Sequence, residues 1–430
     1  MNTLNDSLEK AAKFANTNKN FITNIYKSPL YNDEPKAFAY SGIYKSRYKR
    51  NTDVSCGFSF NKKVALMRVL GEGIERYCLE HYKPKIAFVG RIQDVKKDYL
   101  DPHIVTAFSN NQLAKSNFKR FKISDKSFFR WAKGFSLTRK KSIFIPAQLV
   151  SFNYAPMNNE PIVLLPISTG TAAGLSVDDA IYRAVCEIIE RDAFMISYLN
   201  KLSCPKIHLH SIKDSKIQKI LNIFERYKLE LIVLDITTDV KIPVFVALTL
   251  DRTGLGPAVS VGLKAGFDIK ESIIGAIEES LMTRSWIRDK LIYLNPDCKQ
   301  KKIVQSLEDR AHFWLPAEMI EKLDFWLHSK NAEKFTNYRL SSTKNNLKSA
   351  TALLEKSRME IIYVDITDQT IKRNGFWVIR TIIPQLHPLY LDERYPYLGR
   401  NRLYTAPIRM DVLKKPNIEN QLNKIPHPFL

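Results

Sequence analysis

Cysteine is scarce in this sequence, and no two cysteines stand at a metal-binding spacing. The five thiols are Cys56, Cys78, Cys186, Cys204 and Cys298. The lack of a Cys-x-x-Cys pair argues against a zinc ribbon, and the wide separations argue against a disulfide scaffold. We therefore expect reduced thiols and a cytoplasmic protein.

Long apolar runs and a secretory signal are also missing. The opening stretch, "MNTLNDSLEKAAKFANTNKN", is polar and has neither an apolar core nor a small-residue cleavage site. The apolar run "PIVLLPI" at 161–167 is far shorter than the roughly 20 residues that span a bilayer. We expect no membrane partner.

Acidic residues are fewer than basic ones: the chain has 44 Asp and Glu and 66 Lys and Arg, which gives a net charge of +22. Such an excess can attract nucleic acid or anionic substrates. The lysines are scattered, however, with only short clusters such as "RKK" at 139–141, and no RNA-binding or zinc-finger signature is present. We therefore do not expect nucleic acid as the main partner. The basic surface could instead hold an acidic leader peptide or a partner protein.

Helix-like and strand-like segments are mixed along the chain without a low-complexity linker, which predicts an α/β fold. Residues 1–50 are polar and poorly periodic, and 51–63 are interpreted as a turn that leads into a helix. Helical periodicity predicts helices at 64–82, from Ser176 onward, at 270–290 and in a lysine-rich stretch at about 300–358. Apolar β-rich runs predict strands at 142–154, 229–236, 242–251, 359–367 and 375–384.

A Glu-x-x-Glu-Arg run occurs twice, each time within a predicted helix. The residues are Glu72, Glu75 and Arg76 in the first copy, and Glu187, Glu190 and Arg191 in the second. Positions i, i+3 and i+4 share a helix face, so each copy gathers two carboxylates and a guanidinium. On a solvated face this is ordinary salt-bridge decoration, but buried carboxylates need a cation. Mg²⁺ is the obvious candidate, because it accepts one or two carboxylates together with water and phosphate oxygens.

The surroundings of the two copies favour a site over decoration. Gly71 and Gly73 flank the first copy and would weaken a plain surface helix. The small-residue loop at 168–174, "STGTAAG", precedes the second helix and suits close backbone approach to a ligand. The sequence contains no P-loop and no protein-kinase motif. Two helices that face each other across a nucleotide triphosphate would explain both copies.

Four segments together resemble the YcaO family. They are "ALMRVLGEGIERY", "FRWAKGFSLTRKKSIFIPAQLVSFNY", "PISTGTAAGLSVDDAIYRAVCEIIERDAF" and "VDITDQTIKRNGFWVIRTIIPQLHPLYLDERYPYLGRNRLY". The last residues, "PHPFL", are similar to the proline-rich end of the azoline-forming members, although a frayed tail is the alternative. The resemblance covers roughly 51–430 and implies mixed sheets packed with helices around a nucleotide site.

The resemblance implies ATP- and Mg²⁺-dependent activation of peptide backbone amides. In azoline-forming members, a Cys, Ser or Thr of a ribosomally made precursor peptide becomes a thiazoline or oxazoline. The implied metal ligands are Glu72, Glu75, Glu187 and Glu190. The implied nucleotide contacts are Ser168, Arg76, Arg191, Asp179 and Glu279, with Arg191 as the better candidate for phosphate. The carboxylate of Leu430 is the implied catalytic group.

Some positions depart from the family pattern. Arg68 stands where Ser is usual, Met282 replaces a Gln before Arg284, and the chain ends in Leu430 rather than Pro. Gly275 stands where an Arg is common, so one phosphate contact of the family is not expected here.

The resemblance also implies a domain division and partners. We expect an N-terminal segment at 1–50, a catalytic domain at 51–410 and a tail at 411–430 that reaches the active site. Because 1–50 is too short for a leader-binding domain, we expect a separate leader-peptide-binding, E1-like partner and a flavin dehydrogenase. Thioamide or amidine formation on the same ATP site stays an alternative, as does a non-catalytic nucleotide- or nucleic-acid-binding protein.

Overall fold

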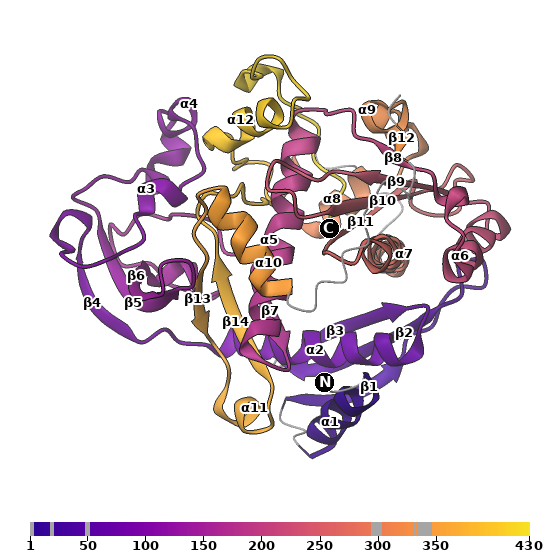
Figure 1. The fold of residues 1–430 in the computed structure, drawn as a ribbon, viewed down its shortest axis with the longest axis horizontal. Coiled ribbons are helices and arrows are strands. Elements are labelled where there is room, and N and C mark those ends of the chain that lie inside the picture. Colours follow the sequence, from indigo (N-terminus) through magenta and orange to yellow (C-terminus); the bar gives the residue numbers. More distant parts are fainter. Residues whose placement is uncertain (1–3, 18–20, 48–51, 294–302, 330–331, 334–345) are drawn as a thin grey trace.

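The computed structural model describes the chain apart from residues 1–3, 18–20, 48–51, 294–302, 330–331 and 334–345. The described strands form three sheets that are covered or separated by helices (Figure 1). This architecture confirms the predicted α/β class. Among the described residues, no helix is both long and apolar enough to cross a membrane.

The first sheet belongs to the N-terminal part of the chain. Its antiparallel strands are β1 (Ile22–Lys27), β2 (Phe38–Lys45) and β3 (Thr52–Ser59). The helix α2 (Lys62–His81) packs on β3 and β2, and α1 (Leu4–Thr17) packs on α2. Asn61 caps α2, because its side chain accepts hydrogen bonds from the backbone N–H groups of Lys63 and Val64.

The structure differs here from the sequence-based expectation. Residues 52–59 form a strand where a turn was expected, and the polar residues before them hold α1, β1 and β2. The alternation of Val54, Cys56 and Phe58 is the strand signal that the turn interpretation missed. In α1, Ala11, Phe14 and Ala15 are buried at helical spacing, and few other apolar residues reinforce that pattern. The pairing of β2 with β3 spans the predicted boundary at residue 50.

The second sheet has five strands. Their order is β11 (Val259–Ala265), β10 (Val244–Leu250), β9 (Glu230–Asp235), β8 (Lys206–Ile207) and β12 (Ala332–Glu333). Strand β10 is buried on both faces: Val244 and Val246 belong to one core, and Phe245 and Ala247 to another. This explains why β10 is a continuous apolar run rather than an alternating one. The predicted strands 229–236 and 242–251 are confirmed as the antiparallel pair β9 and β10.

The third sheet carries the C-terminal strands and has six members. The order is β4 (Ile86–Arg91), β5 (Phe128–Ser136), β13 (Ile362–Asp365), β14 (Trp377–Ile382) and β7 (Thr171–Gly174), with β6 (Lys141–Pro146) paired to β5. The predicted strands 359–367 and 375–384 are confirmed as β13 and β14, although both are shorter than expected. The predicted strand 142–154 ends early, because a 3₁₀ turn begins at Ala147, directly after Pro146.

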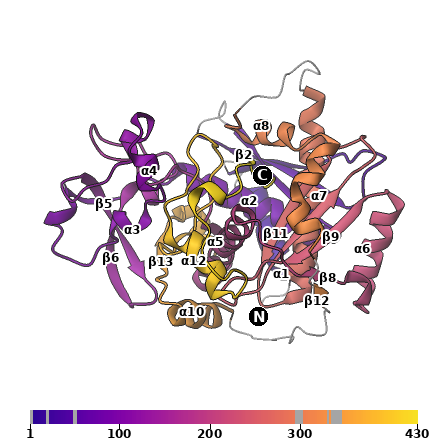
Figure 2. The same cartoon turned by 90° about the horizontal axis from the view of Figure 1, so that it is seen from above.

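Helix α5 (Val177–Leu199) lies between the second and third sheets (Figure 2). It contacts β14 and β7 on one side and β10 and β11 on the other. Ser176 caps it as expected, with its hydroxyl accepting from the N–H of Asp179 at 3.1 Å. Helix α7 (Ile269–Tyr293) covers the other face of the second sheet and confirms the predicted helix at 270–290.

The remaining helices are short and lie around this frame. The sequence predicted one helical stretch at about 300–358. The described residues there form three separate α-helices, because Pro316 interrupts the helical pattern. The remaining α-helices are α3 (Pro102–Val105), α4 (Asn110–Leu113), α6 (Ser215–Arg226), α8 (Leu307–Phe313), α9 (Asp324–Leu327), α10 (Asn346–Lys356), α11 (Gln369–Arg373) and α12 (Asn401–Arg409).

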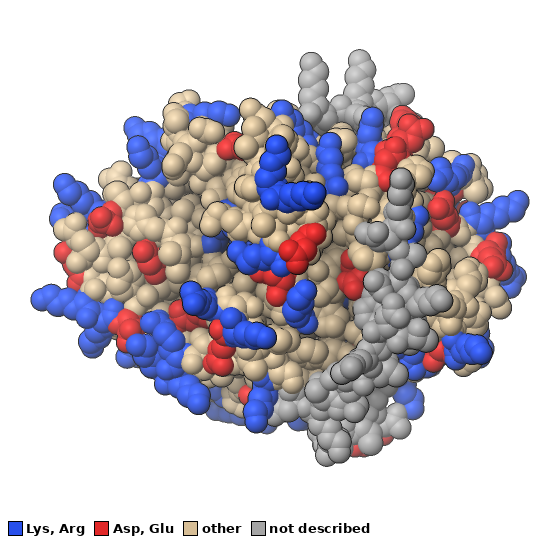
Figure 3. All heavy atoms as spheres, turned by 45° about the horizontal axis from the view of Figure 1, so that its top comes forward, with Lys and Arg blue, Asp and Glu red and all other residues tan. Residues whose placement is uncertain are grey.

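The basic side chains are spread widely over the surface. On the face shown in Figure 3, Lys and Arg project from many places, and Asp and Glu stand between them. That face therefore carries no single basic stripe of the kind that follows a nucleic-acid backbone.

Candidate nucleotide site

The first Glu-x-x-Glu-Arg run lies on α2 beside strand β3. The carboxylate of Glu72 accepts a hydrogen bond from the backbone N–H of Cys56 at 2.7 Å. Its other oxygen lies 3.4 Å from Nη2 of Arg76, and both side chains are about one-third exposed. This carboxylate therefore already has one backbone donor and one cation.

Glu75 faces α5. The backbone N–H of Ala173 donates to its carboxylate, and Glu187 of the second run repels it. Burial, and after it Glu187, raises the pKa of Glu75 to about 8. Burial disfavours the charge of Arg76, but Glu72 and Glu75 outweigh this effect and raise its pKa. The two runs thus meet at Glu75 and Glu187.

The second run lies on α5, where its two glutamates contact different neighbours. Glu187 accepts a hydrogen bond from the backbone N–H of Gly170 at 3.0 Å and lies 3.3 Å from Arg191. Glu190 is buried, accepts from the backbone N–H of Ala265 at 2.8 Å and lies 3.4 Å from Nζ of Lys264. Both carboxylates are therefore held in place by backbone donors.

Arg191 has hydrogen-bonding capacity that the described protein atoms leave unused. Its guanidinium lies 4.1 Å from the ring centroid of Phe429, and only Nη2 reaches Glu187. Nε and Nη1 are buried and have no hydrogen-bond partner among the described residues. Buried donors without partners are costly, and a guanidinium with two free donors is suited to bidentate phosphate binding.

A third helix adds a carboxylate, and the neighbouring strand adds a lysine that the sequence analysis missed. Glu279 of α7 accepts from the backbone N–H of Leu263 at 2.5 Å, and burial together with Glu190 raises its pKa to about 7. Lys264 of β11 points to Glu190, which raises the pKa of the lysine. A Cβ at Gly275 would lie 3.0 Å from Cγ of Lys264, so the glycine leaves room for the lysine stem. A lone lysine in a strand belongs to no motif, so the sequence offered no signal for it.

The loop before β7 is fixed by a buried arginine that also escaped the sequence analysis. Nη1 of Arg380 donates to the carbonyls of Ser168 and Thr169 and to the hydroxyl of Thr171. Burial lowers the pKa of Arg380 to about 10, against the opposing effect of Glu187 and Glu75. The only sequence signal for Arg380 was one arginine inside the apolar strand "GFWVIRTIIP".

The backbone at Gly170 shows why the loop at 168–174 needs a glycine at this position. Its φ is +87°, and a Cβ would lie 2.5 Å from the carbonyl oxygen of Thr381. Only glycine fits there without strain. Its N–H is therefore free to reach Glu187, while Ser168 remains partly exposed at the start of the loop.

Asp179 lies in the first turn of α5 and not among the glutamates. Its carboxylate accepts from the backbone N–H of Leu175 at 3.2 Å and from Nε of Arg183 at 2.9 Å. It lies about three helical turns before Glu190, so the two share a helix side roughly 16 Å apart. Asp179 could therefore contact only a different end of an extended ligand.

The C-terminal residues run back along α5 from its end towards the second run. The N–H of Asn423 donates to the carbonyl of Leu199, and the hydroxyl of Tyr198 donates to the carbonyls of Ile425 and Pro426. Further on, the ring of Phe429 packs on that of Phe194 at 5.4 Å. The tail is thus packed rather than frayed, and Phe429, one residue before the end of the chain, lies against Arg191.

Two arginines of the family-like segments have structural partners: Arg68, which departs from the family pattern, and Arg284, which follows it. Arg68 forms an ion pair with Glu278 at 2.7 Å and joins α2 to α7. Arg284 is fully buried and binds both oxygens of Glu34 as well as Asp251, so it ties the N-terminal part to the second sheet. Among the described residues, Arg284 has no unpaired buried donor of the kind found at Arg191.

The arrangement fits cations that are shared with phosphate. In the described part of the chain, no group of three or more His, Cys, Asp or Glu side chains forms a ready-made metal centre. The carboxylates instead act on one another in pairs across elements, because Glu187 raises the pKa of Glu75 and Glu190 raises the pKa of Glu279. Mg²⁺ takes few protein ligands and completes its shell with water and phosphate. The paired carboxylates and the free donors of Arg191 suit such ions on a triphosphate.

Comparison with known proteins gives a family match over most of the chain. A family model described as YcaO cyclodehydratase, ATP- and Mg²⁺-binding, matches residues 56–387. An uncharacterised protein of Methanothermobacter thermautotrophicus is 22% identical over 364 residues, which are 82% of this chain and 86% of that protein.

Solved structures share the fold. A heterocyclase in complex with substrate and cofactor superposes with a TM-score of 0.82 at 19% identity, over 100% of this chain and 57% of that chain. This chain therefore spans little more than half the length of that heterocyclase. YcaO from Methanopyrus kandleri, bound with AMPPCP and Mg²⁺, gives a TM-score of 0.66 at 15% identity, over 90% and 91%. The E. coli microcin synthetase McbBCD complex with pro-MccB17 bound gives 0.59 at 14%, over 84% and 88%.

Proposed function

This chain belongs to the YcaO family, whose cofactors are ATP and Mg²⁺, and from that premise we propose that it is an azoline-forming cyclodehydratase. Its substrate is the backbone amide of a ribosomally made precursor peptide. A Cys, Ser or Thr side chain closes onto the carbonyl carbon of the preceding residue and gives a thiazoline or oxazoline with net loss of water. When bound, ATP supplies the phosphoryl group that carries away the amide oxygen, and Mg²⁺ neutralises phosphate charge.

The observation that carries this proposal is that Arg191 has two buried donors without partners and lies near buried Glu190 and partly buried Glu75, Glu187 and Glu279. Glu72, Glu75, Glu187 and Glu190 would hold Mg²⁺, with Glu279 beside Glu190. Arg191 would bind phosphate, and Arg76 would orient the carboxylates on its side. Charge neutralisation and positioning are the main needs of phosphoryl transfer.

Three other predicted site residues, Ser168, Asp179 and Leu430, would also contact the nucleotide or the peptide. Ser168 starts the loop that Arg380 holds, so its hydroxyl would meet the nucleotide. Asp179, at the other end of α5, would face the nucleoside end of an extended nucleotide. Leu430 would bring its carboxylate to the reacting amide, because Phe429 anchors the tail at Arg191.

Partner proteins complete the proposal. The McbBCD synthetase is a multi-chain complex with its precursor bound, which supports a similar arrangement here. We propose a separate leader-peptide-binding, E1-like protein that delivers the precursor, and a flavin dehydrogenase that oxidises the rings. The described cysteines are free, which supports a reducing, cytoplasmic setting.

The decisive experiment follows peptide mass. The chain is mixed with ATP, Mg²⁺, a Cys/Ser/Thr-rich precursor and its cognate partner. Loss of one water per modified residue supports azoline formation. Exchange of the amide oxygen for sulfur would instead indicate thioamide formation. Absence of ATP turnover in every mixture would contradict both azoline and thioamide formation.

A further inference from the structure

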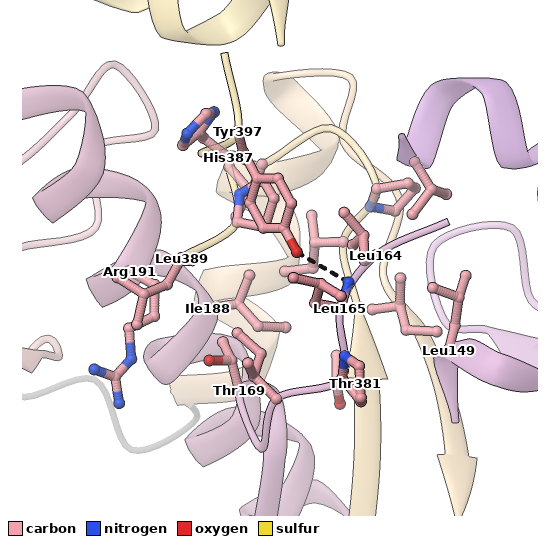
Figure 4. A pocket seen from close by; sticks show the side chains of 18 of the residues that line it. Leu149, Leu164, Leu165, Thr169, Ile188, Arg191, Thr381, His387, Leu389 and Tyr397 are labelled. Carbon is pink, nitrogen blue, oxygen red and sulfur yellow. Dashed lines mark hydrogen bonds between the residues drawn. The ribbon is translucent and has the colours of Figure 1, made fainter. Parts of the chain in front are cut away.

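A partly open cavity lies directly beside the candidate nucleotide site (Figure 4). It lies between α5, the end of β14 and the residues that follow this strand. Six of the side chains that line it are Leu149, Leu164, Leu165, Ile188, Leu389 and Tyr397.

The inner wall offers little to a charged ligand. Besides Arg191, two arginines line it and donate to backbone carbonyls: Arg380 to the loop at 168–169, and Arg400 to Val105 and Pro384. Of their buried donor atoms, only Nε of Arg400 has no partner among the described residues. The hydroxyl of Tyr397 accepts from the backbone N–H of Leu165. In Figure 4 the imidazole of His387 points away from the leucines. Most of the lining side chains are aliphatic, so a charged group inside would lose most of its water.

The mouth of the cavity adjoins the phosphate-binding candidates. On α5, Glu187 points to the loop N–H while the next residue, Ile188, lines the cavity. Thr169 and Arg191 stand at the edge, and Figure 4 shows the Arg191 guanidinium turned away from the leucines. Adjacent residues of α5 therefore face the carboxylate cluster on one side and the apolar cavity on the other.

We propose that this cavity binds the aliphatic side chain of the precursor residue directly before the cyclised Cys, Ser or Thr. The inference rests on the proposed function, because that residue owns the carbonyl that reacts. Its Cβ is only two bonds from the reacting carbon, so a carbonyl held near Arg191 places the side chain at the mouth. The cavity therefore selects a leucine-like residue and rejects an acidic one.

The test measures binding, not turnover. The probes are N-acetyl-Leu-Cys-amide, N-acetyl-Gly-Cys-amide and N-acetyl-Asp-Cys-amide, titrated by ligand-observed NMR with and without Mg²⁺ and a non-hydrolysable ATP analogue. Burial of a leucine side chain should favour the first probe over the second by roughly 10- to 100-fold. The aspartate probe should bind weakest.

Two variants and a control locate the effect. Leu164→Trp fills the cavity and should remove the leucine advantage while the glycine probe binds as before. Leu149→Ala enlarges the cavity and should favour a phenylalanine probe over the leucine probe. Leu255, which is 71% exposed and outside the cavity, provides the matched control Leu255→Trp, which should change nothing.

The outcomes separate this inference from the proposed function. Equal binding of the leucine and glycine probes to the unmodified chain would overturn the cavity assignment, even if the nucleotide analogue binds. Displacement of the leucine probe by the analogue would also overturn it, because the cavity would then hold nucleotide. A leucine preference without any analogue binding would keep the cavity and contradict the proposed function.

Discussion

The same five-residue pattern occurs on α2 and on α5, yet the two helices use it differently. On α2, Arg76 neutralises Glu72 and Glu75 and is one-third exposed. On α5, Arg191 is more buried and keeps two donors free. The contrast goes with burial, because α5 is buried over most of its length between two larger sheets. Helix α2 also contacts β7 and β14 but is buried over a smaller part of its length. The repeated motif therefore balances charge on α2 and leaves two arginine donors unpaired on α5.

The largest effect should come from the buried glutamate of α5. Glu190→Gln should lower ATP turnover by roughly 100- to 1000-fold, because it removes a negative charge that the backbone N–H of Ala265 holds in place. Glu72→Gln on α2 should lower turnover less. Turnover rates with circular dichroism as a folding control check this, and equal losses for both variants would remove the asymmetry.

The arginines give the next contrast. Arg191→Lys should raise the KM for ATP by about 10-fold or more, since a lysine cannot replace a bidentate contact. Arg76→Lys keeps the charge that balances the two α2 glutamates and should change KM little. Steady-state kinetics on both variants measures the difference, and a larger effect at Arg76 would reverse the assignment.

The unpredicted lysine should have a moderate effect that belongs to the α5 side. Lys264→Met should weaken nucleotide binding several-fold, because Glu190 and Glu279 lose a nearby cation. Gly275→Ala should act in the same direction, since the new Cβ crowds the lysine stem. Calorimetric titration of a nucleotide analogue with Mg²⁺ measures both, and unchanged affinity in Lys264→Met would exclude the lysine from the site.

The smallest expected effect is a pH dependence of the metal-free fold. The pKa of Glu75 is raised in the folded state to about 8, so the folded chain keeps this carboxyl neutral while the unfolded chain ionises it near 4.5. The stabilisation is complete below pH 4.5 and is lost as the pH rises towards 8. Thermal midpoints without Mg²⁺ should fall over that range, and Glu75→Gln should flatten the fall. An unchanged slope in the variant would place the pH dependence elsewhere.

The sequence predicted the helices and strands in which apolar residues recur at a regular helical or strand spacing. Residues of α2, α5, α7, β9 and β10 show such patterns. Weak patterns hid α1 and β3, where few apolar residues carry the period. The paired glutamates were found by their spacing and by the family resemblance. Arg380 and Lys264 could not be found, because their roles depend on β14 and β11 lying next to α5.

The position of α5 between two sheets has a consequence for hydrogen exchange. Its amides can open only if the packing of both sheets is disturbed, so they should exchange near the rate of global unfolding. Helix α2 is buried over a smaller part of its length and should open more readily. Ligand binding should then appear mainly as slower exchange on α2, while α5 stays protected whether or not a nucleotide is bound.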